Sequence, residues 1–198
     1  MSGRLQSGLI AGLWLSWVVY WVLAARGVKP VSRRESPASR LAYLTPLVIG
    51  ALIMALASVR SSWLGARFLP PAMMIYGSGI AVMLAGLVVT VWARRHLGTN
   101  WSGTITIKRG HDLVRTGPYR FVRHPIYSGV ILAIIGTAVA LGEWLGFVGA
   151  ALIVGSFLVK LWLEERILAE VFGDDHVRYR AEVPALVPRF FGSRARCR

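Results

Sequence analysis

The amino-acid sequence predicts an all-α integral membrane protein with about five transmembrane helices. Of its 198 residues, 55% are hydrophobic and only 16% are charged, and the mean hydropathy is +0.56. A soluble domain carries about 25% charged residues, so this chain has too few charges to cover a water-facing surface. In addition, five apolar stretches are long enough to span about 30 Å of hydrocarbon. The basic residues gather in the segments between them.

The predicted spans are residues 8–25, 41–59, 72–93, 126–142 and 144–163. The fourth is short and contains glycine. Because it meets the fifth at Gly142 and Glu143, these two spans should form a tight helical hairpin. The first span differs from a signal peptide, since its basic residues follow the apolar stretch instead of preceding it.

The distribution of lysine and arginine predicts the orientation in the membrane. Of 23 basic residues, five lie in residues 26–40, seven in 94–125 and seven in 164–198. By the positive-inside rule, the N-terminus lies outside, and these three segments and the C-terminus are cytoplasmic. Attraction to anionic lipid then accounts for most of the net charge of +14, so membrane lipids, and no nucleic acid, are the expected partners.

Two cytoplasmic segments carry residues suited to chemistry. The loop before the fourth span contains the sequences GHDLVRTGPY and VRHPIY, and the fifth span ends with Lys160 and the pair Glu164-Glu165. Lys160 and Glu164 share a helix face by their spacing, as do His124 and Tyr127. Structural alternatives remain open: Lys160 could extend to the interface beside Glu164. Arg123 could be an interfacial anchor, and His124 a hinge before Pro125.

Several other kinds of site are not predicted. The four histidines show no metal-ligand spacing, so we expect no metal site. The one cysteine, Cys197, excludes a disulfide framework. The sequence also contains neither a GxSxG nucleophile motif nor a phosphate-binding P-loop.

The ordered segments GHDLVRTGPYRFVRHPIYSG and, about 35 residues later, EERILAEVFGDDHVRYRAEVPALVP resemble the isoprenylcysteine carboxyl methyltransferase family. The resemblance covers roughly residues 96–191 and is greatest to compact prokaryotic members. It implies an integral membrane enzyme of the cytoplasmic (inner) membrane that uses S-adenosyl-L-methionine and releases S-adenosyl-L-homocysteine. Residues 1–93 would then form three N-terminal transmembrane helices and their loops. Residues 94–198 would form the methyltransferase core.

The resemblance also implies roles for individual residues. The cytoplasmic loop and C-terminal segment would form the cofactor pocket, lined by His111, Asp112, Leu113, Val114, Tyr119, His124, Pro125, Ile126, Tyr127, Glu164 and Glu165. Three residues would be catalytic: Arg123, Lys160 and His124. Lys160 stands where the family has a substrate-contacting arginine. This departure matters because lysine offers a point charge in place of a bidentate fork.

Carboxyl methylation of a lipophilic, isoprenylcysteine-like substrate is the leading functional hypothesis. A carboxylate is ionised at neutral pH and needs no general base, whereas an amine or thiol acceptor would need His111 or His124 to remove a proton. The alternatives are a phospholipid amine or small thiol methyltransferase, a sterol-reductase-like enzyme, and a non-catalytic protein that docks on anionic lipid. The oligomeric state is left open.

Overall fold

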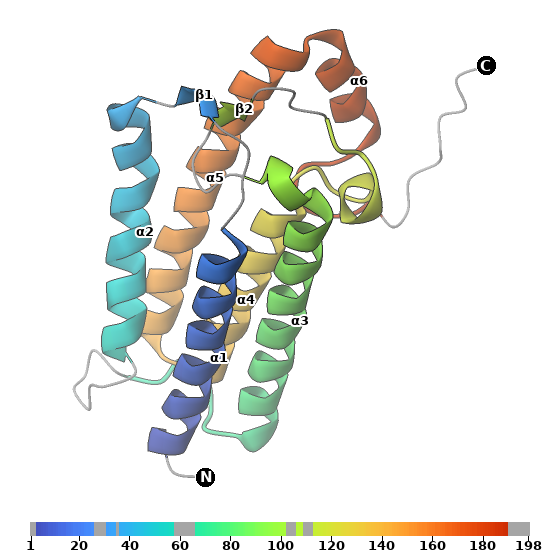
Figure 1. Cartoon of the computed structure of the whole chain (residues 1–198). Coiled ribbons are helices and arrows are strands. Elements are labelled where there is room, and N and C mark those ends of the chain that lie inside the picture. The colour runs from blue at the N-terminus through green and yellow to red at the C-terminus, as the bar shows by residue number, and fades with distance from the viewer. Residues whose placement is uncertain are drawn as a thin grey trace.

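The computed structural model describes residues 3–25, 31–34, 36–57, 66–101, 106–108 and 113–189. These residues form a helical bundle with a small antiparallel ribbon and a short helix at one end (Figure 1). The α-helices are α1 (Gly3–Ala24), α2 (Pro37–Ala57), α3 (Met73–Leu97), α4 (Pro125–Leu141), α5 (Trp144–Phe172) and α6 (Asp174–Glu182). The 3-10 helices are η2 (Gly98–Asn100) and η3 (Gly117–Arg120), and the strands are β1 (Val31–Arg34) and β2 (Thr106–Lys108).

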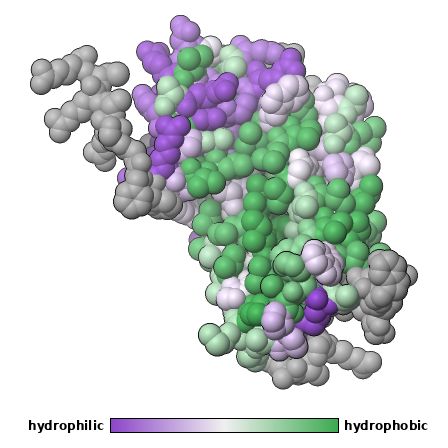
Figure 2. Space-filling view, turned by 180° about the vertical axis from the view of Figure 1, so that it is seen from behind, coloured by the Kyte–Doolittle hydropathy of each residue, from purple (hydrophilic) through white to green (hydrophobic). Residues whose placement is uncertain are grey.

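Each predicted span corresponds to one helix, so the predicted all-α membrane fold is confirmed. By length and composition α1, α2, α3 and α5 can cross a membrane, whereas α4 is a shorter apolar helix of 17 residues. Helix α5 continues beyond residue 163 to Phe172 and therefore holds Glu164 and Glu165 in regular helix. Figure 2 shows hydrophobic residues over the bundle and hydrophilic residues gathered mainly at one end.

The ribbon of β1 and β2 was not predicted from the sequence. The two strands pair Val31 with Lys108 and Arg34 with Thr106. Each is only three or four residues long. These strands are far apart in the sequence, so their pairing depends on how the helices between them are packed. The local sequence of each strand does not predict it.

Helix α4 packs mainly on α3, and α5 packs mainly on α2. Glycines permit the close approach: a Cβ on Gly129 of α4 would lie 2.7 Å from the backbone oxygen of Gly86 of α3. Similarly, a Cβ on Gly50 of α2 would lie 2.7 Å from the backbone oxygen of Gly149 of α5. In lipid, where no hydrophobic effect drives helices together, such close backbone contact contributes directly to association.

Substitution of Gly86 by leucine is expected to destabilise the bundle, because the new side chain would collide with the backbone of α4. Overpacking of this kind costs about 1–3 kcal/mol, which lowers the apparent Tm by several degrees for a chain of this size. The measurement is thermal unfolding in detergent. Gly77→Leu is the matched control on the same helix, since a Cβ there meets open space in the described structure. Equal Tm values for the two variants would contradict the packing argument.

Helix α1 is joined to the bundle through tryptophans. The indole Nε1–H of Trp14 donates to Thr137 Oγ1 of α4 at 3.1 Å, and that of Trp17 donates to Thr90 Oγ1 of α3 at 2.7 Å. Trp17 also stacks on Trp21, with ring centroids 4.5 Å apart. Because large side chains make these contacts, the backbone of α1 stands away from its neighbours.

Candidate active site

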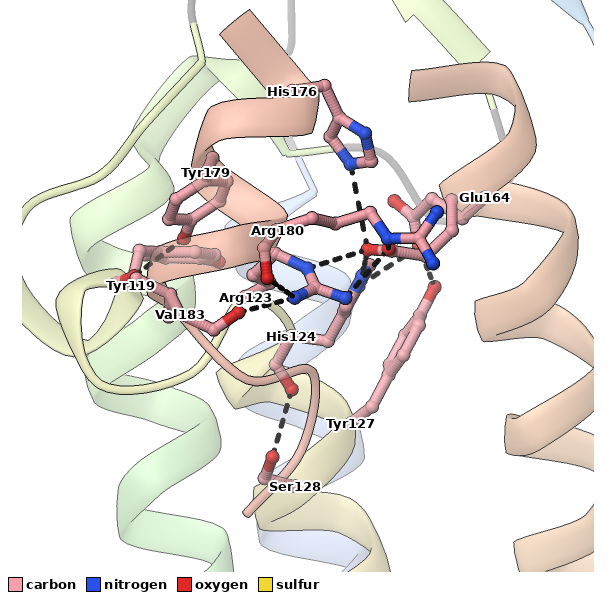
Figure 3. Close-up of polar contacts among 11 residues, drawn as sticks. Tyr119, Arg123, His124, Tyr127, Ser128, Glu164, His176, Tyr179, Arg180 and Val183 are labelled. Atoms are coloured by element: carbon pink, nitrogen blue, oxygen red, sulfur yellow. Dashed lines mark hydrogen bonds and ion pairs between the residues drawn. The ribbon is translucent and has the colours of Figure 1, made fainter. Parts of the chain in front are cut away.

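Most of the polar residues singled out in the sequence meet at one end of the bundle (Figure 3). The segment before α4 contributes Arg123 and His124, and the first turn of α4 contributes Tyr127. The last turns of α5 contribute Glu164 and Glu165. Helix α6 and the residues after it close the far side of this cluster.

Glu165 lies at the centre of the cluster. Arg123 donates to it bidentately, from Nε to Oε1 at 3.1 Å and from Nη2 to Oε2 at 2.8 Å. His124 Nε2 lies 2.6 Å from Oε1, and because an ionised carboxylate only accepts, the imidazole is the donor. The side chains of Arg123 and Glu165 are only 9% and 10% exposed. Such a buried bidentate pair fixes the orientation of both partners.

The chain after α6 is fastened to the start of α4. The backbone N–H groups of Arg123 and His124 donate to Pro184 and Ala185 at 2.9 and 3.0 Å. Arg123 Nη1 donates to the Val183 carbonyl, and Ser128 Oγ donates to Leu186 at 2.6 Å. Arg123 therefore links α4, α5 and the C-terminal segment.

Tyr119 of η3 is tied to α6 by a buried hydrogen bond. The hydroxyl of Tyr179 donates to the Tyr119 carbonyl at 2.6 Å. Burial raises the pKa of Tyr179 to about 12 and raises the pKa of Tyr119 above its ordinary value. Both phenols are therefore protonated at neutral pH, which keeps Tyr179 a donor.

Glu164 has a different environment from its neighbour Glu165. Its side chain is 31% exposed and accepts a hydrogen bond from the Tyr127 hydroxyl at 2.5 Å. His124 Nδ1 lies 3.6 Å from the same carboxylate, and the His124 and Tyr127 rings are stacked. Since a carboxylate offers about four acceptor positions, Glu164 keeps capacity to accept from a ligand, whereas most of that of Glu165 is used.

Lys160 lies one turn before Glu164 and is half-buried. Its Nζ is 5.2 Å from the ring centroid of Tyr43 of α2 and 5.5 Å from that of Tyr127. Aromatic faces attract a cation at these distances. The two tyrosines therefore hold the ammonium group toward the interior of the bundle.

An apolar cavity of about 600 Å³ lies among α1, α2, α4 and α5. Its walls include Trp14, Trp17, Leu47, Ile134 and Phe157. Phe157 also packs against Tyr127, with ring centroids 5.3 Å apart. Tyr127 thus contacts both a wall residue of the cavity and Glu164.

The loop before α4 is shaped by Gly117. Its φ is 59°, and a Cβ there would lie 2.6 Å from the His96 ring, so both the backbone conformation and the space require glycine. Of the loop residues predicted to bind the cofactor, Leu113 and Val114 are half-buried, and His111 and Asp112 lie outside the described residues. Pro125, which is buried, begins α4, and Ile126 follows it.

Sequence reasoning did not single out His176 and Arg180 of α6. His176 Nε2 lies 3.7 Å from Glu165 Oε1, and Arg180 Nε lies 3.6 Å from Oε2. Their four-residue spacing places both on one face of a helix, and this spacing could have indicated that they belong to the same site. Among the described residues, no group of three or more histidine, cysteine or acidic side chains is arranged to hold a metal ion.

The fold and the site together define a class: a helical membrane protein with a charged site at one end of the bundle and an apolar cavity among its helices. Residues 74–175 match the phospholipid methyltransferase family. The chain belongs to this family, and it is an integral membrane protein.

The relatives agree with the resemblance seen in the sequence, which is thereby confirmed. The chain is 32% identical over 113 residues to protein-S-isoprenylcysteine O-methyltransferase B of Arabidopsis thaliana, covering 56% of this chain and 57% of that protein. It is 41% identical over 70 residues to methanethiol S-methyltransferase 1 of Bradyrhizobium diazoefficiens, covering 35% of this chain and 24% of that protein. The chain therefore spans little more than half of the first relative.

The fold is also similar to a solved structure, that of the eukaryotic intramembrane Ras methyltransferase named isoprenylcysteine carboxyl methyltransferase. The TM-score is 0.53 at 23% sequence identity, and the match covers 79% of this chain and 54% of that one. At this identity the likeness shows the fold.

Proposed function

We propose that the protein transfers a methyl group from S-adenosyl-L-methionine to the carboxylate of a lipophilic, isoprenylcysteine-like acceptor. The observation that carries this proposal is the position of Tyr127. Its hydroxyl binds Glu164 at 2.5 Å, and its ring contacts both Lys160 and Phe157. A hydrogen-bond acceptor for the cofactor and a cation for a carboxylate therefore meet at Tyr127, and its neighbour Phe157 belongs to the wall of a cavity that could take an apolar tail.

The residues present fit the cofactor. Glu164 is partly exposed and has acceptor capacity for the hydroxyl or amino groups of a nucleoside or amino acid. Leu113, Val114 and Tyr119, with His111 and Asp112, would wrap one side of the cofactor, and His124, Pro125, Ile126 and Tyr127 the other. Glu165 would support this pocket through Arg123 and His124. When bound, S-adenosyl-L-methionine supplies an electrophilic methyl group on a sulfonium.

The residues around the acceptor have mainly to orient it and exclude water. A carboxylate is ionised at neutral pH, so no base must act on it, and orientation alone can lower a barrier by several kcal/mol. Lys160 would hold the carboxylate as a point charge. Arg123 would contribute indirectly, since its guanidinium is bound to Glu165. The acceptor tail would occupy the apolar cavity, which it reaches from the lipid.

The same arrangement predicts where the reaction takes place. By the positive-inside rule, the basic segments 26–40, 94–125 and 164–198 support an orientation in which the charged end of the bundle would lie on the cytoplasmic side of the inner membrane and the N-terminus outside. A water-soluble cofactor would enter from the cytoplasm, and the lipophilic acceptor, a small molecule or a lipidated protein, from the membrane.

A second candidate is methyl transfer to a phospholipid amine or a small thiol. The similarity to methanethiol S-methyltransferase 1 favours it. Such an acceptor must lose a proton, and His124 is the candidate base. Its Nδ1 lies 3.6 Å from Glu164, and its Nε2 is held by Glu165 at 2.6 Å.

The test is calorimetric titration of S-adenosyl-L-homocysteine into the detergent-purified protein. We expect saturable binding that Glu164→Gln weakens about tenfold or more, because a hydrogen bond to a charged group contributes about 1.5–3 kcal/mol. Glu170→Gln, an exposed position on the same helix, is the control and should bind as the wild type does.

Labelled methyl transfer to three acceptors then identifies the reaction: N-acetyl-S-farnesylcysteine, phosphatidylethanolamine and an alkanethiol. Labelling of the first supports the carboxyl reaction, and labelling of either of the others supports the second candidate. No binding of S-adenosyl-L-homocysteine by folded protein, in detergent and in lipid nanodiscs, would overturn both. Binding of a reduced nicotinamide in its place would favour a sterol-reductase-like enzyme.

A further inference from the structure

His176 is a buried imidazole that the proposed reaction does not use. It lies on α6 and is only 1% exposed. Neither ring nitrogen has a hydrogen-bond partner among the residues that the structure describes. Because buried polar groups are almost always hydrogen-bonded, an imidazole in this state points to a partner that it gains in another state of the site.

The geometry identifies Glu165 as that partner. Arg123 and His124 both donate to its Oε1, and Arg123 also donates to Oε2, so one of the roughly four acceptor positions of the carboxylate, on Oε2, stays open. His176 Nε2 lies 3.7 Å from Oε1. A small movement of α6 toward α5 would bring this nitrogen within hydrogen-bond distance. Gly173, between the two helices, has a φ of 50°, a conformation that only glycine adopts readily.

We propose that His176 is a positioning residue that, when neutral, donates its Nε2–H to Glu165 as α6 closes on the site. The added hydrogen bond would fix the carboxylate that orients Arg123 and His124. This inference rests on the proposed function, because it takes the cluster to support the cofactor pocket.

The charges around His176 explain why its neutral form is the effective one. It faces Glu165 from α5, Arg123 and His124 from the segment before α4, and Arg180 from α6. Burial lowers the pKa of His176, and the nearby cations lower it further against the opposing effect of Glu165. A protonated ring would add another positive charge beside two guanidinium groups and one carboxylate.

The pH dependence follows from this direction. The unfolded chain has a histidine pKa of about 6.5, and the folded value is lower. The unfolded state therefore binds the proton first, and stability falls as the pH drops below about 6.5 and through the folded pKa. Closure of α6, and with it cofactor affinity, should weaken as the pH falls through the lowered pKa of the folded state, where His176 gains its proton.

Two variants test the proposal. His176→Gln keeps an uncharged N–H donor of similar reach, and His176→Phe keeps the ring volume without a donor. We expect the wild type to lose affinity for S-adenosyl-L-homocysteine as the pH falls from about 7.5 through the folded pKa of His176, which lies below the ordinary value of about 6.5. His176→Gln should lose much less over this range, and His176→Phe should bind weakly at every pH.

The apparent Tm of the ligand-free protein, measured over the same pH range, gives a readout that needs no cofactor. It should fall in acid for the wild type and stay nearly constant for His176→Gln. The proposal would be overturned if His176→Gln lost Tm and affinity at low pH as the wild type does. It would also be overturned if His176→Phe bound S-adenosyl-L-homocysteine with wild-type affinity. If the wild type binds no S-adenosyl-L-homocysteine, the proposed function fails, and the Tm profiles still decide the coupling of His176 to Glu165. If His176→Phe does not fold, His176→Gln decides.

Discussion

Replacing Glu165 by alanine is expected to release α6 and residues 183–186 from the bundle and to cause the largest loss of stability. Arg123 would remain buried without its counterion, and His124 would lose its 2.6 Å partner. Removal of one member of a buried ion pair costs about 3–5 kcal/mol. The measurements are the apparent Tm in detergent and hydrogen exchange of residues 174–186, whose amides should lose protection.

Glu164→Ala is the matched control for this effect. Glu164 has the same chemistry one residue earlier on α5, but its side chain is 31% exposed and accepts mainly from Tyr127. We expect its loss of stability to be far smaller, because Arg123 keeps its counterion. Unchanged protection of residues 174–186 in Glu165→Ala would show that the backbone hydrogen bonds to Pro184 and Ala185 hold the segment by themselves.

Replacing Lys160 by methionine is expected to have the largest effect on catalysis. The change keeps an apolar stem against Tyr43 and Tyr127 and removes the charge proposed to hold the acceptor carboxylate. Truncating one partner of a buried charged pair costs about 2–5 kcal/mol. We therefore expect kcat/KM for N-acetyl-S-farnesylcysteine to fall about hundredfold, from a loss of about 2.7 kcal/mol. The affinity for S-adenosyl-L-homocysteine should change little.

Two comparisons separate this role from a structural one. Lys160→Arg keeps a cation at the same helical position and should retain much of the activity that Lys160→Met loses. If Lys160→Met weakens binding of S-adenosyl-L-homocysteine as much as Glu164→Gln does, the division between acceptor and cofactor residues is wrong.

The helices and the grouping of the candidate residues were predictable from the sequence because both depend on local signals. A run of apolar residues specifies a membrane helix wherever it packs, since the backbone polar groups must be satisfied within the segment. Helical spacing likewise places Lys160 beside Glu164, and the motif order brings Arg123, His124 and Tyr127 to the start of one helix. The predicted span ends at residue 163, where polar residues begin, but α5 continues to Phe172. Polar residues mark the edge of the membrane and do not by themselves end a helix.

The tertiary structure decided what each carboxylate does. Glu164 and Glu165 are adjacent and chemically identical, but successive residues of a helix point about 100° apart. One therefore faces Tyr127 and the other faces Arg123 and His124. Which direction meets which partner depends on how α4, α5 and α6 are packed, and the sequence around the two residues contains no sign of it. The cavity beside Tyr127 and the position of His176 arise in the same way, from contacts between segments that are distant along the chain.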